Sequence, residues 1–178
     1  TPPTMKESPI RRLPHARTAL LATAAALAGT AAHAKSDEAF MKDAAQAGAA
    51  EIEASRLAAS KARNADVKSF ANSMIADHTK VANEQKALAA SKNVKLPDEP
   101  SMAQKAEIKL IDAGDNDKFD ERYARYFGVK AHEDTIKLFE EAARDAKDPE
   151  VKAWAQKTLP GLRHHLQMAR DLGAAPKK

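Results

Sequence analysis

Four polar side chains interrupt apolar stripes that otherwise follow the helical period, and each is of a type that can bind a metal. They are Glu51, His78, His132 and His165. Imidazole nitrogens together with one carboxylate suit zinc, copper or iron better than calcium or magnesium, which prefer oxygen ligands. These four residues are therefore the candidate ligands of a transition-metal site.

Their distances from two predicted turns place the four residues at one level. Glu51 and His78 lie 13 and 14 residues from Asn64 in the first turn, which is about 20 Å along either helix at 1.5 Å per residue. His132 and His165 lie 16 and 17 residues from the second turn, or roughly 25 Å. Helices of this length are about 40 Å long, so all four residues fall near the middle.

Two acidic residues adjoin this layer in sequence. Asp77 precedes His78 and Glu133 follows His132, and we expect both carboxylates to accept hydrogen bonds from imidazole N–H groups. The layer also has a metal-free interpretation, in which Glu51 accepts from a protonated histidine and the network fixes the register of the helices. The residues leave both interpretations open.

The motif that di-iron sites of helical bundles require is missing. Such sites use carboxylates from all four helices and two Glu-x-x-His motifs. The positions three residues before the candidate histidines are all apolar: Ile75, Val129 and Leu162. We therefore expect neither ferroxidase activity nor iron storage. The pattern favours a protein that binds without turnover, with a metal-dependent oxidoreductase as the weaker alternative.

The elements that would position these residues are helices. Alanine, the strongest helix former, is abundant, aromatic residues make up only 4% of the chain, and no alternating β-branched run occurs. The apolar period predicts four long helices and one short helix, over residues 37–62, 66–92, 117–146, 149–172 and 102–113.

The order of these helices predicts a topology. Residues 66–71 resemble residues 150–155, and each segment follows a tight turn, as in a repeated helical hairpin. A connection of some two dozen residues with two prolines and the short helix joins the two hairpins. This arrangement predicts an all-α fold, an antiparallel four-helix bundle of ferritin-like type with a long crossover.

The N-terminal segment has the three parts of a signal peptide. Basic residues precede an apolar stretch over 19–28 that is too short to span a bilayer, and Ala32-His33-Ala34 forms a small-x-small cleavage site. We predict a signal peptide over residues 1–34, cleaved after Ala34, with the residues before Met5 as an upstream extension.

The predicted mature domain, residues 35–178, is close to neutral. The leader contains four basic residues and one acidic residue, so 25 basic and 24 acidic residues remain, and a nucleic-acid partner is not expected. No later segment is apolar enough to be transmembrane, and the chain has no cysteine for disulfides or thiolate ligands. We expect a periplasmic protein, free or associated with the outer membrane.

Short motifs across residues 37–172 carry a resemblance to a known family. The sequence resembles the bacterial exported family of unknown function whose members are described as putative outer membrane or predicted secreted proteins. That resemblance implies a ferritin-like four-helix fold and an envelope location, and it supplies no activity. The matching motifs are Ala49-Ala50-Glu51-Ile52, Val67-Lys68-Ser69-Phe70-Ala71, Ala76-Asp77-His78-Thr79-Lys80, Ala131-His132-Glu133, Thr158-Leu159-Pro160 and His165-Leu166.

Two functional hypotheses follow. The first is an envelope protein that binds zinc, copper or iron at the mid-bundle layer. The alternative is a metal-free structural or protein-interaction module of the envelope, with a stress-related role. Its protein partner would bind on a helix face or at the connection around residues 102–111. The sequence does not indicate an oligomeric state.

Overall fold

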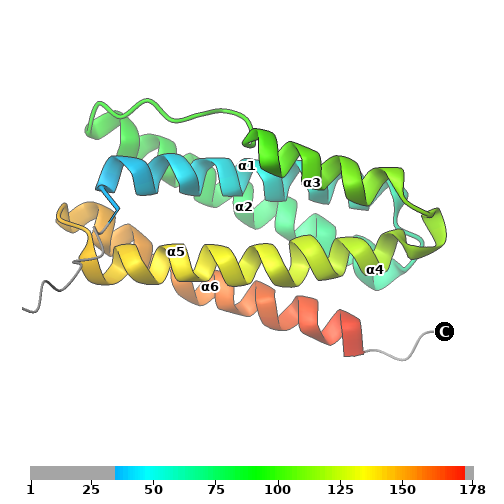
Figure 1. Ribbon diagram of the computed structural model, residues 1–178. Coiled ribbons are helices and arrows are strands. Elements are labelled where there is room, and N and C mark those ends of the chain that lie inside the picture. Colours follow the sequence, from blue (N-terminus) through cyan, green and yellow to red (C-terminus); the bar gives the residue numbers. More distant parts are fainter. Residues whose placement is uncertain (1–34, 175–178) are drawn as a thin grey trace, which may run out of the picture. The chain divides into compact units, whose positions relative to one another are not determined.

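The computed structural model describes residues 35–174, which form helices and connections with no β-strand among them (Figure 1). The predicted all-α class is thus confirmed. The predicted signal peptide and its cleavage site fall outside the described residues, as do residues 175–178. Among the described helices, none combines the length and apolar character needed to cross a membrane.

The first hairpin consists of α1 (Asp37–Lys61) and α2 (Ala65–Ser91), within one residue of the predicted bounds. Each helix begins at a polar cap: the Ser36 hydroxyl accepts from the Ala39 N–H, and the Asn64 side chain accepts from the Asp66 N–H. The hairpin thus starts and turns where its capping residues satisfy free backbone N–H groups.

The connection leaves α2 through a left-handed residue. Asn93 has φ 55°, a conformation that asparagine tolerates better than most residues after a helix. A capping box between Ser101 and Gln104 then begins α3 (Met102–Ala113), which packs against α1 and buries Ile108 and Ile111. The short helix therefore covers the first hairpin.

The third long helix is not the uniform α-helix that the sequence predicts. It comprises a 3-10 turn η1 (Asn116–Lys118), α4 (Phe119–Tyr123), a π-helical segment η2 (Ala124–Ala131) and α5 (His132–Asp145). The buried side chains explain the difference. Tyr123 and Phe127 are four residues apart, whereas the next, His132, follows after five. Wider π turns keep all three on the inner face.

The fourth long helix, α6 (Pro149–Ala174), starts as predicted and ends two residues later than predicted. The Asp148 carboxylate accepts from the backbone N–H groups of Glu150 and Val151, and proline occupies the first helical position. Pro160 lies within this helix. A well-capped start thus fixes where α6 leaves its turn.

Each hairpin holds the turn of the other. At the α1–α2 turn, the Asp120 carboxylate of α4 accepts from the backbone N–H groups of Arg63 and Asn64. At the α5–α6 turn, the Asp37 carboxylate of α1 accepts from the N–H groups of Lys147 and Asp148. The two hairpins are therefore joined by reciprocal hydrogen bonds as well as by packing.

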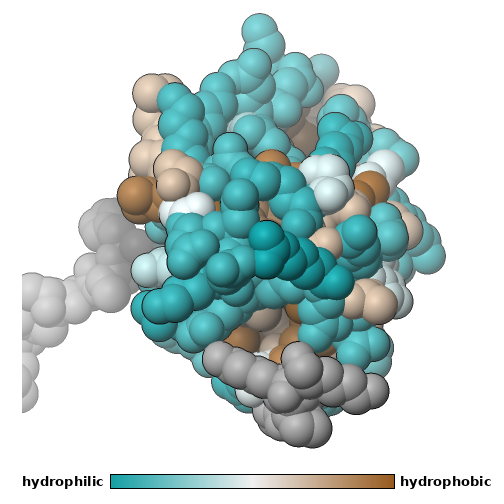
Figure 2. All heavy atoms as spheres, turned by 90° about the vertical axis from the view of Figure 1, so that its right-hand side faces the viewer, coloured by the Kyte–Doolittle hydropathy of each residue, from teal (hydrophilic) through white to brown (hydrophobic). Residues whose placement is uncertain are grey.

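The helices form a bundle in which α1 packs mainly against α2, and α5 against α6 (Figure 1). Further contacts join α1 to α5 and α2 to α6. The core consists of two apolar clusters. One centres on the rings of Phe40, Phe139 and Trp154, and the other on those of Phe70 and Tyr123. Hydrophilic side chains cover most of the face in Figure 2, where apolar residues form small, separate groups.

Two helical glycines give opposite predictions for stability. A Cβ at Gly48 would meet no atom within 4 Å, so Gly48→Ala should raise the free energy of unfolding by about 0.5–1 kcal/mol through helix propensity. A Cβ at Gly128 would lie 2.8 Å from Ala169 Cβ, so Gly128→Ala should lower it by about 1–3 kcal/mol. Urea denaturation measures the free energy of unfolding of both variants, and changes of the same sign would contradict this packing.

Candidate metal centre

Three histidines from three helices converge in the interior. His78 on α2, His132 at the start of α5 and His165 on α6 are all buried, and one ring nitrogen from each lies within 4.8 Å of the others. The ring centroids are 5.3–5.5 Å apart. The structure thus brings together the three histidines that the sequence places at one level.

The closest pair has a spacing that fits metal coordination. His78 Nε2 lies 3.4 Å from His132 Nε2. Two nitrogen ligands on a tetrahedral zinc ion are ~3.3 Å apart when each Zn–N bond is ~2.0–2.1 Å. These two nitrogens therefore already have the separation of neighbouring ligands.

The backbone fixes which nitrogen of His132 is free. His132 Nδ1 lies 2.8 Å from the carbonyl oxygen of Phe127, in the π-helical segment. A carbonyl oxygen can only accept, so Nδ1 carries the proton and donates, and Nε2 of the neutral ring has its lone pair facing His78. Sequence reasoning missed this carbonyl, although the five-residue step between two core positions was a usable signal.

A surface carboxylate orients the third imidazole. His165 Nε2 donates to Asp77 Oδ2 at 2.9 Å. This bond leaves Nδ1 as the available nitrogen of His165, and that atom is buried without a hydrogen-bond partner. Partners of this kind fix the tautomer and ring orientation of metal-binding histidines.

Glu51 lies on the other side of the His132 ring. Its Oε1 is 3.5 Å from His132 Nδ1, and the carboxylate does not belong to the group of nitrogens that converge within 4.8 Å. Glu51 is buried, and neither of its oxygens has a hydrogen-bond partner among the described residues. The geometry thus places Glu51 beside the protonated Nδ1 of His132 and outside the group of converging nitrogens.

Glu133 is directed to the surface. Its carboxylate accepts from Arg170 at 2.8 Å, and the described hydrogen bonds include none from an imidazole to Glu133. Because Glu133 follows His132 directly on a helix, its side chain points about 100° away from that of His132. The predicted hydrogen bond from an imidazole is therefore found at Asp77, and for Glu133 the prediction was wrong.

The comparisons with known proteins can be set against this geometry. The profile of one family, described as a domain of unknown function (DUF4142), matches residues 22–172, which is most of the chain. The chain belongs to the DUF4142 family. Among curated proteins there is no significant match, and the same holds for solved structures. All three converging histidines lie within the matched part of this DUF4142 chain.

Burial keeps the imidazoles of this DUF4142 domain neutral. Removal from water lowers the pKa of His78 well below its ordinary value, and the two neighbouring histidines lower it further. Burial also lowers the pKa of His132 to about 4, and it lowers that of His165 despite the opposing effect of Asp77. Neutral imidazole is the form that binds metal, so the site is ready for a cation at neutral pH.

These pKa shifts predict acid sensitivity. His132 has a pKa of about 4 in the folded protein and an ordinary value of 6.5, so between these pH values the unfolded chain binds the extra proton. Chelator-treated protein should therefore lose on the order of 2 kcal/mol of stability through His132 between pH 7.5 and pH 5. Urea denaturation of wild type and His132→Gln at both pH values measures this difference.

The exposed neighbour His164 supplies the control, since His164→Gln should keep the wild-type pH dependence. Imidazole NMR gives a direct check on the same sample. A His132 resonance that titrates near pH 6.5 in the folded protein would contradict the assignment.

Proposed function

We propose that this protein binds one transition-metal ion through His78, His132 and His165. The observation that carries the proposal is the convergence of three buried ring nitrogens, two of which belong to rings whose other nitrogen is bonded elsewhere. Three imidazoles suit zinc, copper or iron. They leave one coordination position free for water or another small ligand, as in open zinc sites.

In this proposal Glu51 supports a ligand and does not complete the ligand set. Its Oε1 lies 3.5 Å from His132 Nδ1, the protonated nitrogen, and Glu51 is outside the group of converging ligand atoms. Glu51 makes no hydrogen bond to this nitrogen, which donates to the Phe127 carbonyl, so its effect on His132 is electrostatic. Asp77 differs, because it accepts a hydrogen bond from His165 Nε2.

We further propose an exported, ferritin-like bundle in the periplasm. The leader pattern over residues 1–34 supports export, and the absence of cysteine is compatible with that compartment. Two helical hairpins joined by a long connection support the ferritin-like arrangement. With a single core glutamate, the function that fits best is metal binding, sensing or protection against stress, without turnover.

A metal-free module of the envelope is the second candidate. His78 Nε2 lies within reach of a hydrogen bond to the His132 Nε2 lone pair, so part of the layer can be satisfied without metal. Met102 and Leu110 on α3 are 80% and 71% exposed, and a protein partner could bury them. This candidate leaves His165 Nδ1 buried and unpaired, which is why we prefer the metal.

The metal content of protein from Lys35 onward, isolated from periplasm without chelator, tests the main proposal. We expect about one zinc, copper or iron ion per chain by mass spectrometry, because all three imidazoles are neutral and convergent. His165→Ala should lose the ion, whereas His164→Ala, an exposed neighbour on the same helix, should keep it. Folded wild type that neither contains nor takes up these ions would favour the metal-free module.

Asp77 and Glu133 provide a matched pair of carboxylates next to ligands. Asp77→Asn removes the charged acceptor at His165 Nε2 and should weaken zinc binding by about 10–100-fold. Glu133→Gln should leave zinc affinity unchanged, since this carboxylate pairs with Arg170. Competition against a zinc-binding dye measures both constants, and equal affinities in the two variants would remove Asp77 from the site.

A further inference from the structure

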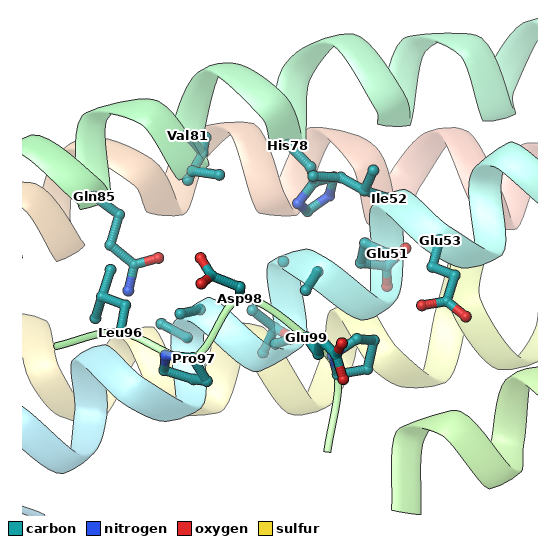
Figure 3. A pocket seen from close by; sticks show the side chains of 18 of the residues that line it. Glu51, Ile52, Glu53, His78, Val81, Gln85, Leu96, Pro97, Asp98 and Glu99 are labelled. Atoms are coloured by element: carbon teal, nitrogen blue, oxygen red, sulfur yellow. The ribbon is translucent and has the colours of Figure 1, made fainter. Parts of the chain in front are cut away.

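A cavity of about 550 Å³ lies beside the histidines, between α1, α2 and the connection that precedes α3. Figure 3 shows Glu51 and His78 toward one end of it, and Gln85 and Leu96 toward the other. Its lining residues on α1 extend from Ala44 to Arg56, a distance of about 18 Å at 1.5 Å per residue. The cavity is therefore elongated along the helices.

Small residues on α1 leave this space open. Alanines and Gly48 line one wall, and nothing lies within 4 Å of the position that a Gly48 side chain would take. Opposite walls are apolar, with Val81, Phe139 and Leu162 among them. The volume lies within the range of small-molecule sites in proteins, roughly 300–1,000 Å³.

Two residues that line this cavity have buried polar atoms without hydrogen-bond partners. Trp154 is 7% exposed, and its indole N–H makes no hydrogen bond among the described residues. Glu51 is 3% exposed and both of its oxygens are unpaired. Buried polar groups are normally satisfied, so two unpaired groups beside one cavity are unusual.

The exposed and half-buried charges around the cavity cancel. Three basic and three acidic side chains line it in addition to Glu51, namely Arg56, Lys86, Lys105, Glu53, Asp98 and Glu99. Four of these side chains form two ion pairs, Lys86 with Asp98 and Lys105 with Glu99. A balanced rim attracts neither cations nor anions over a distance, which favours an uncharged ligand.

We propose that this cavity binds an uncharged, elongated organic molecule whose apolar body lies along α1. The walls supply the apolar surface and the length. This site is separable from the proposed metal: His132 and His165 are not among its lining residues, although His78 and Glu51 lie at both sites.

The protein contains its own reporter, because Trp154 is the only tryptophan of the chain. The probe is prodan, an uncharged, elongated naphthalene ketone whose emission moves to shorter wavelength in apolar surroundings. We expect saturable binding of one prodan per chain, a blue shift, and energy transfer from Trp154. Emission that increases linearly with prodan, without saturation or energy transfer, would overturn the proposal.

Two glycines give a matched pair of variants. Gly48→Leu places a side chain in the open space and should weaken prodan binding by at least about tenfold, since the cavity is then partly filled. Gly161→Leu is the control, because Gly161 is also helical and open but does not line the cavity. Circular dichroism checks that both variants are folded. Equal affinities in the two variants would place the probe elsewhere and reject this site.

The same titration separates this site from the metal site. Prodan should bind chelator-treated wild type and His165→Ala with affinities within about twofold of each other, since His165 does not line the cavity. Metal loss with retained prodan binding would leave the cavity proposal standing alone. Loss of prodan binding in His165→Ala, with the helical content intact, would refute the independence of the two sites.

Discussion

The rest of this structure depends on three neutral imidazoles that lie at one level of an apolar core. Along three helices, each histidine separates a residue of one apolar cluster from a residue of the other, as in Met74, His78 and Val81 of α2. A polar layer in that place lowers core stability unless its groups are paired. The Phe127 carbonyl accepts a hydrogen bond from His132, and Asp77 accepts one from His165. Both bonds leave the second nitrogen of the ring free.

Much of the fold could be predicted from the sequence because helix ends depend on local chemistry. Ser36, Ser101 and Asp148 start their helices where capping rules place them. The common level of the histidines followed from the helical rise alone. The rotation of each helix about its axis could not be predicted in this way, because it depends on packing. The orientation of Glu51 toward His132 Nδ1, and of Glu133 toward Arg170, could not be obtained from spacing.

The π-helical segment and the cavity show two further limits of sequence reasoning. A uniform period of 3.6 residues hides the step of five between Phe127 and His132, because a single wide turn shifts the pattern by less than one residue. The cavity results from side chains that are too small to meet, such as those around Gly48. An alanine-rich stripe is typical of close helix packing as well as of an open space, and only the backbone separation distinguishes them.

The reciprocal bonds at the two turns have a consequence for how such a chain could arise. Asp120 satisfies the turn of the first hairpin, and Asp37 satisfies that of the second. One hairpin alone lacks the acceptor for its own turn, so the smallest unit that satisfies both is the pair. A half-length ancestor would meet this requirement as a symmetric dimer with exchanged carboxylates. Gene duplication and fusion would then convert an intermolecular bond into an intramolecular one.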